Sequence, residues 1–187
     1  MDKHYFIGIP MPSQIHSIAT SKQEELQLRQ FYKAIPYPED LHITLLFIGG
    51  FPQEKLQPMQ EVLKRISEHH DSFTLQITGV SSFGSNYTPR VIYLSVLNSD
   101  PLNSINRDIV EKACIFLDQS KKEKFVPHVT IAKKWKGIDG FNFQQQTFSP
   151  IGIEIDSFSL FEINPSRTPK YHPVETYELQ QKGRPSQ

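Results

Sequence analysis

The feature that most constrains this chain is a duplicated unit, in which a strand and a helix lead to a second strand that carries His-x-Thr. Apolar runs, helical spacing and flanking prolines place the elements at strand 5–9, helix 13–32 and strand 41–48, then at strand 91–97, helix 101–118 and strand 127–133. Two such units predict two pseudo-symmetric lobes around one central cleft.

The remaining elements favour an α+β fold. A helix is expected over 53–69, because Leu56, Met59, Leu63 and Ile66 form a helical stripe. The other expected segments are a strand at 73–77, a loop at 81–89, a strand at about 151–163 and a final strand near 173–179. This order is not a regular β-α alternation, so we predict mainly antiparallel sheets with outer helices. Residues 1–187 then form a single bilobal domain with a polar tail at about 181–187.

Composition limits the partners and the compartment. Lys plus Arg and Asp plus Glu both number 20, which argues against a broad grip on long duplex nucleic acid but permits a local pocket for a strand end. The single Cys114 excludes an intramolecular disulfide and a Cys₄ metal site, and suits a reducing cytosol. Neither a signal peptide nor a membrane span is recognisable, so a cytoplasmic location and no membrane partner are expected.

The two His-x-Thr strands carry the chemistry. Residues i and i+2 of a strand share a face, so His42 lies beside Thr44 and His128 beside Thr130. Displacement at phosphorus needs one group that takes a proton and one that gives a proton, and two histidines supply both near neutral pH. The two hydroxyls would hold phosphate oxygens. Such a pair needs no metal and no cofactor.

The structural alternative is that both histidines serve packing alone. A single His-x-Thr strand favours that interpretation, whereas two copies in equivalent units leave a paired site and two structural histidines equally open. His69 and His70 are adjacent in the expected helix and do not share a face, so no metal site is expected there. The chain also contains no P-loop and no H-E-x-x-H motif.

Four segments together resemble a known family: FIGIP at the N-terminus, PEDLHITLLFIG, FGSNYTPRVIYL and PHVTIAK. The chain resembles the two-histidine (2H) phosphoesterases, and within them the LigT-like RNA 2′,3′-cyclic phosphodiesterases, also called 2′-5′ RNA ligases. The resemblance implies a bilobal fold and metal-independent hydrolysis of a ribose 2′,3′-cyclic phosphate to a 2′-phosphate. It implies that His42 donates a proton to the 3′ oxygen, that His128 accepts one from water, and that Thr44 and Thr130 bind phosphate.

Other residues are weaker candidates for substrate contacts. Lys133 stands where many relatives carry Arg, which keeps the charge but loses the planar fork. Arg90 either lines the cleft or forms a surface ion pair, and Phe83 and Tyr87 either stack on a base or pack in the core. The loop 165–171 is a further candidate for the substrate mouth.

Three functions therefore remain open. The first is hydrolysis of cyclic phosphate ends of RNA or of small cyclic nucleotides by a monomer with no obligate protein partner. The second is 2′-5′ RNA end joining, or hydrolysis of another small cyclic phosphoester, in the same cleft. The third is a non-catalytic protein that binds RNA ends or nucleotides.

Overall fold

The computed structural model describes residues 3–117 and 124–181. The strands are β1 (Lys3–Pro10), β2 (Tyr32–Ala34), β3 (His42–Phe51), β4 (Phe73–Gly84), β5 (Pro89–Val96), β6 (His128–Trp135), β7 (Gln146–Ile155), β8 (Ser157–Ile163) and β9 (Tyr171–Glu178). The helices are α1 (Ser13–Glu25), α2 (Leu28–Phe31), α3 (Leu56–Ser67) and α4 (Asp100–Ala113), with 3₁₀ turns η1 (Pro38–Asp40), η2 (Gln53–Lys55) and η3 (Cys114–Phe116). Apart from Gln181, the predicted polar tail lies outside the described residues.

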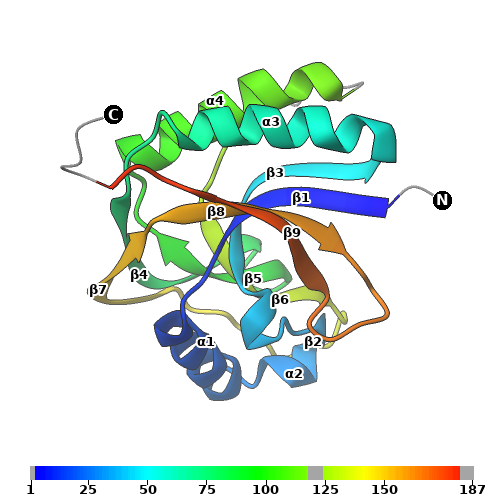
Figure 1. Ribbon diagram of the computed structural model, residues 1–187. Coiled ribbons are helices and arrows are strands. Elements are labelled where there is room, and N and C mark those ends of the chain that lie inside the picture. The colour runs from blue at the N-terminus through cyan, green and yellow to red at the C-terminus, as the bar shows by residue number, and fades with distance from the viewer. Residues whose placement is uncertain (1–2, 118–123, 182–187) are drawn as a thin grey trace.

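The strands form two antiparallel halves in the order β7-β4-β5-β6 and β3-β1-β8-β9, with β2 beside β6 (Figure 1). The halves meet through one residue pair, Ile43 with Val129. On each side of this pair the His-x-Thr strand is followed by the first strand of its own unit, β1 beside β3 and β5 beside β6. The predicted α+β fold with pseudo-symmetric antiparallel sheets is confirmed. The structure adds that the two sheets are hydrogen-bonded into one.

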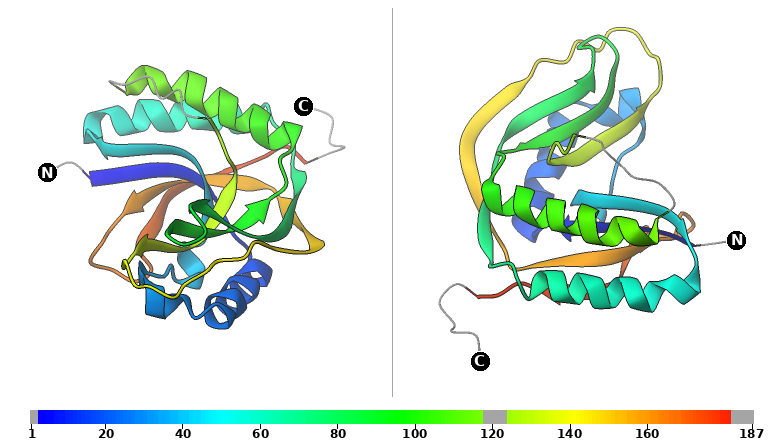
Figure 2. Two further views of the ribbon diagram at one scale, coloured as in Figure 1. Left: turned by 180° about the vertical axis from the view of Figure 1, so that it is seen from behind. Right: turned by 90° about the horizontal axis from the view of Figure 1, so that it is seen from above.

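Each half is covered by a helix that belongs to the other half in sequence. Helix α4 connects β5 to β6, yet it packs beside α3 and contacts β3 (Figures 1 and 2). Helix α1 follows β1, yet it contacts β6. The expected outer helices are therefore present, and their exchange between the halves joins the lobes around one core. None of the helices in the described ranges is long and apolar enough to cross a bilayer.

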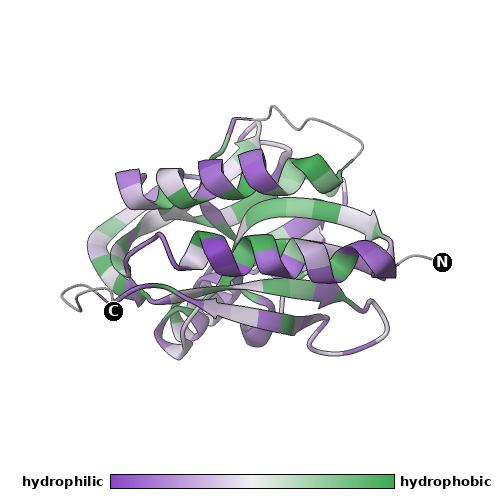
Figure 3. Ribbon diagram, turned by 45° about the horizontal axis from the view of Figure 1, so that its top comes forward, coloured by the Kyte–Doolittle hydropathy of each residue, from purple (hydrophilic) through white to green (hydrophobic). Residues whose placement is uncertain are grey.

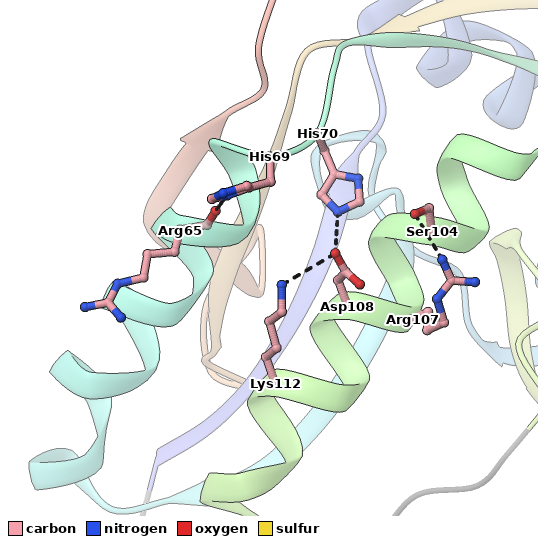
Figure 4. A network of polar contacts seen from close by, with 7 residues as sticks. All are labelled: Arg65, His69, His70, Ser104, Arg107, Asp108 and Lys112. Atoms are coloured by element: carbon pink, nitrogen blue, oxygen red, sulfur yellow. Dashed lines mark hydrogen bonds and ion pairs between the residues drawn. The ribbon is translucent and has the colours of Figure 1, made fainter. Parts of the chain in front are cut away.

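Helix α3 shows how the sequence pattern becomes packing. Its residues Leu56, Met59, Leu63 and Ile66 are buried, while the polar positions between them face outward (Figure 3). Beyond its end, the His70 Nε2 lies 2.9 Å from Asp108 Oδ2 of α4 (Figure 4). This contact ties the end of α3 to α4. Within residues 3–117 and 124–181, no cluster of His, Cys, Asp or Glu is arranged to hold a metal.

The single long helix predicted over 13–32 is wrong beyond Glu25. It begins at Ser13 as expected, but Gln27 has a left-handed φ of 50° and separates α1 from the short α2. The chain then extends as β2, and the buried Tyr32 hydroxyl donates to the Pro89 carbonyl at 2.8 Å. Burial of this large aromatic side chain beside β6 decides the local structure over helical propensity.

Two strand boundaries also differ from the prediction. The loop expected over 81–89 is mostly strand, because β4 continues to Gly84 and Ser81, Ser82 and Phe83 pair with β5. The single strand expected over 151–163 is two strands, β7 and β8, which lie in different halves. The chain passes from one half of the sheet to the other at Asp156, where apolar residues continue on both sides and the sequence pattern shows no break.

Gly79 of β4 is a position where we predict a large stability effect. A Cβ atom at Gly79 would clash with the Gln146 carbonyl oxygen of β7, so the backbone would have to move. Gly79→Ala should destabilise the fold by about 1–3 kcal/mol, the usual cost of overpacking. At roughly 2–4 °C per kcal/mol for a chain of this size, the melting temperature falls measurably.

The matched control is Gly152→Ala in β7, where the new Cβ would make only an ordinary contact of 3.6 Å with Thr74. Thermal unfolding of both variants should show the loss in Gly79→Ala alone. Equal melting temperatures for the two variants would mean that β4 and β7 are not packed as closely as described.

Candidate active site

The two His-x-Thr motifs meet where the halves of the sheet join. Their central residues, Ile43 and Val129, pair with each other and are fully buried. In an antiparallel ladder this register sets His42 across from Thr130 and Thr44 across from His128, all on the face opposite the core. The two histidines therefore occupy diagonal corners, about 7–8 Å apart at the backbone. All four side chains are half-buried.

Each histidine ring is held by the same kind of local hydrogen bond. The Nδ1–H of His42 donates to the Asp40 carbonyl at 2.7 Å, and the Nδ1–H of His128 donates to the Val126 carbonyl at 2.8 Å. Both acceptors lie two residues before the histidine. A carbonyl can only accept, so each neutral ring carries its proton on Nδ1 and leaves Nε2 for chemistry. The Nε2 of His42 accepts from the Thr44 hydroxyl at 3.1 Å.

Aromatic side chains enclose the His42 ring. Its centroid lies 4.5 Å from that of Phe6 and 5.1 Å from that of Tyr171. Burial lowers the pKa of His42 to about 4; the hydrogen bond to Asp40 opposes this shift, and the charges of Lys133 and His128 reinforce it. Without a bound anion, His42 is therefore neutral at pH 7.

The His128 ring has a similar but more open setting. Phe83 meets it edge-on at 4.9 Å between ring centroids, and Tyr93 lies at 5.2 Å. Burial lowers the pKa of His128 below its usual range, and the hydrogen bond to the Val126 carbonyl opposes the shift. Both rings thus pack against aromatic side chains on one side, and both line the cleft.

Two adjoining pockets form the cleft. One, of about 140 Å³, is lined by His42, Thr44, Thr130 and Lys133 among others, and the second, of about 470 Å³, contains His128. Thr44 and Phe47 line both. The structure therefore brings together all four motif residues that the sequence analysis selected.

Of the four weaker candidates, two line the pockets that hold the histidines and two do not. Phe83 lines the larger pocket and Lys133 lines the smaller one. Arg90 is exposed at the start of β5, and Tyr87 is 73% exposed in the turn after β4. Neither of these two residues lines the pockets that hold the histidines. The interpretation of Tyr87 as a core residue is wrong, because its ring points to solvent.

Asp40 and Tyr171 are site residues that the motifs do not reveal. The buried Asp40 carboxylate accepts the backbone N–H groups of Lys170 and Tyr171 at 2.8 and 3.0 Å, while its carbonyl holds His42. The Tyr171 hydroxyl in turn accepts from the Lys133 ammonium at 3.4 Å. The loop 165–171 thus reaches the cleft through its last residue, and Asp40 fixes both sides of that contact.

Comparison with known proteins shows the family of the chain. The model of the 2′-5′ RNA ligase superfamily matches residues 15–167. The RNA 2′,3′-cyclic phosphodiesterase of Bacillus subtilis is 29% identical over 94% of this chain and 96% of its own length. That of Geobacillus stearothermophilus is also 29% identical, and there the chain spans 57% of the relative's length.

Solved structures share the fold. Escherichia coli LigT complexed with 3′-AMP superposes with a TM-score of 0.82 at 18% identity, over 97% of this chain and all of LigT. A Thermus thermophilus protein gives a TM-score of 0.79 at 20% identity, over 96% of this chain and 99% of its own. The matched region includes both His-x-Thr strands, and the chain belongs to the 2′-5′ RNA ligase superfamily.

Proposed function

We propose that this protein hydrolyses 2′,3′-cyclic phosphate ends of RNA or nucleotides to 2′-phosphates, with His42 and His128 as the acid and base. The observation that carries the proposal is the diagonal placement of two histidines with Nδ1 fixed on backbone carbonyls and Nε2 left toward one cleft. Relatives named RNA 2′,3′-cyclic phosphodiesterase, which align over most of this chain, support the substrate class.

In the proposed step, water attacks phosphorus and gives its proton to the Nε2 of neutral His128. The bond from phosphorus to the 3′ oxygen breaks, and the Nε2–H of protonated His42 supplies the proton that this oxygen takes up. The product carries a 3′ hydroxyl and a 2′-phosphate. His128 then holds the proton taken from water, His42 has lost its own proton to the 3′ oxygen, and exchange with solvent restores the starting pair.

The neighbouring groups would hold the phosphoryl oxygens. Thr44 and Thr130 stand at the other two corners and can donate hydroxyl hydrogen bonds. The Lys133 ammonium lines the same small pocket, so it lies close to an anion bound between the histidines. We assign it charge neutralisation, which a point charge provides without the two-pronged geometry of arginine.

The test is an assay on a short RNA that ends in a 2′,3′-cyclic phosphate, run in EDTA, with the product typed as 2′- or 3′-phosphate. We expect EDTA-resistant conversion to the 2′-phosphate by wild type and none by the His42→Ala/His128→Ala double variant. The same assay with a 5′-hydroxyl RNA added would reveal end joining. Tight binding of the cyclic end without turnover by folded wild type would instead favour the binding protein.

The remaining expectations belong to the same proposal. Residues 1–187 act as one bilobal domain that needs no protein partner, and the enzyme works as a monomer in the cytoplasm. The lone Cys114 suits such a compartment, where thiols stay reduced.

A further inference from the structure

A third cavity lies beside the histidine pockets and has a different character. It measures about 690 Å³ and is formed by α1, α2, β2, the segment 35–38, the end of β6 and Lys170. We call it the basic groove. No carboxylate in the described part of the chain lines it. Five cations do: Arg29, Lys33, Lys134, Lys136 and Lys170. In a chain of zero formal net charge, this is a marked segregation of charge.

The cations of the basic groove are not neutralised locally. The ion pairs found between described residues are those of Lys3, Lys22, His70 and Lys112, and none involves a lysine or arginine of the groove. Lys136 has a structural role, because its ammonium donates to the Arg29 and Gln30 carbonyls. Lys33 and Lys134 are exposed, and their side chains form no hydrogen bond with a described residue.

The basic groove adjoins the pocket of His42. Pro36 lines both cavities, and the neighbours Lys133 and Lys134 line the pocket and the groove in turn. Lys134 has a left-handed φ of 64°, which is uncommon for a residue with a side chain. Gln23 supports the shared wall by donating to the Pro36 and Ile131 carbonyls.

An exposed aromatic ring completes the chemistry of the groove. Tyr37 is 49% exposed and lines the same cavity as the five cations. A basic track with an aromatic face is the arrangement that binds single-stranded nucleic acid, through phosphate contacts and base stacking. The strand that leads to a cyclic phosphate bound at His42 has to leave that pocket, and the basic groove adjoins it.

We infer that the basic groove binds the RNA strand on the 5′ side of the reacting end, so that the substrate is an oligonucleotide rather than a mononucleotide. This inference rests on the proposed function for the identity of the reacting end. The strand's phosphates contact Lys33, Lys134 and their neighbours, and Tyr37 stacks on a base. The groove contributes binding, while the histidine pair alone handles the chemistry.

The test compares Lys33→Gln/Lys134→Gln with a control of equal charge change, Lys64→Gln/Arg65→Gln on α3. Figure 1 places α3 at the opposite end of the molecule from α2 and β2. Each phosphate contact of a single strand contributes about 0.7 to the slope of log affinity against log salt. Two lost contacts lower that slope by about 1.4 and weaken binding about 25-fold at roughly 0.1 M salt.

Two readouts separate the outcomes. The groove variant should lose about 25-fold in kcat/KM on an RNA of several nucleotides, but nothing on a nucleoside 2′,3′-cyclic phosphate. Fluorescence anisotropy with a labelled RNA that ends in a 2′-phosphate gives the salt slope without turnover. An unchanged kcat/KM and salt slope for the RNA, or equal losses of kcat/KM on both substrates, would overturn the inference that the basic groove binds RNA. If wild type cleaves neither substrate, the proposed function fails, while the salt slope still decides whether the groove binds RNA.

Discussion

His42→Ala and His128→Ala should each reduce kcat/KM for a cyclic phosphate end by about 10²–10⁴, the usual size of one acid or base contribution. The two rings occupy diagonal corners and serve the two ends of one displacement. Loss of either leaves the other without a partner, so the double variant should be little worse than the poorer single variant. The measurement is steady-state hydrolysis of a short cyclic-phosphate RNA.

The division of roles can be tested with the same variants. A substrate whose 3′ bridging oxygen is replaced by sulfur releases a thiolate, which needs no proton to leave. If His42 is the acid, the sulfur substrate should restore most of the activity of His42→Ala and leave His128→Ala impaired. Restoration of His128→Ala instead would exchange the two roles.

The control for both histidine variants is His4→Ala, which removes an exposed imidazole from β1. It should retain full activity on both substrates. Full activity in either His42→Ala or His128→Ala would contradict the paired site, whatever the role of the cleft.

The motif residues could be predicted from sequence because their geometry is local. An i, i+2 spacing on a strand fixes a shared face, and Ile43 and Val129 between the polar pairs indicate the core side. Their mutual pairing was not predicted, because the repeated unit indicated two lobes that face each other across a cleft, whereas the structure joins the two strands in one sheet. The carbonyl acceptors of both Nδ1 atoms, two residues upstream, are also local, but no side-chain pattern marks a backbone carbonyl.

The supporting residues could not be predicted because their contacts are distant in sequence. Asp40 meets the backbone of Tyr171 across 131 positions, and neither residue belongs to a recognisable motif. The passage from one half of the sheet to the other at Asp156 could not be predicted for another reason. Ile153, Ile155, Phe158 and Leu160 are all buried, so an apolar pattern continues through a point where the chain leaves one half for the other.

The basic groove could not be predicted from sequence either, because most of its charges are brought together only by the fold. Its cations come from α2, β2, the end of β6 and the residue before β9. Lys134 and Lys136 are close in sequence, but Arg29, Lys33 and Lys170 are distant from them. Net charge summed over the chain is zero and argued against a broad nucleic-acid surface. Only the fold gathers these residues, so a neutral chain can hold a strongly basic track of limited length.

The dependence of kcat/KM on pH should lie on the acidic side of neutrality. This parameter reports the free enzyme, in which burial lowers the pKa of His42 to about 4 and that of His128 below 6.5. Productive turnover needs one proton on the pair. The plot of kcat/KM against pH should therefore be bell-shaped, with a rise near pH 4 and a fall that begins below pH 6.5. On the alkaline limb, kcat/KM should decrease by about tenfold per pH unit.

The singly protonated free enzyme shares its proton between His42 and His128, and burial lowers the share that His42 carries. The productive form has the same total charge with the proton on His42. The bell keeps its position, since the two forms interconvert without a change in bound protons, and only its height is reduced. The profile alone therefore cannot assign the roles, which is why the sulfur substrate is needed.

Substrate binding should move the bell. An anionic phosphate between the rings stabilises both protonated imidazoles and raises both pKa values, so the profile of kcat should lie at higher pH than that of kcat/KM. Lys133→Met should act on the free enzyme in the same direction, because the charge of Lys133 lowers the pKa of His42. The midpoint of the acidic limb of kcat/KM should then shift to a pH above 4. The control variant Lys55→Met should leave this midpoint unchanged.

Acid unfolding must be separated from this titration. A histidine whose folded pKa is depressed stabilises the fold fully above the unfolded value of about 6.5 and loses that contribution as pH falls toward 4. Circular dichroism across the range, with recovery of activity on return to pH 6, distinguishes the two processes. Coincident profiles of kcat and kcat/KM centred above pH 6.5 would mean that the free histidines are not desolvated, and that the aromatic faces of Phe6 and Phe83 do not exclude water from the rings.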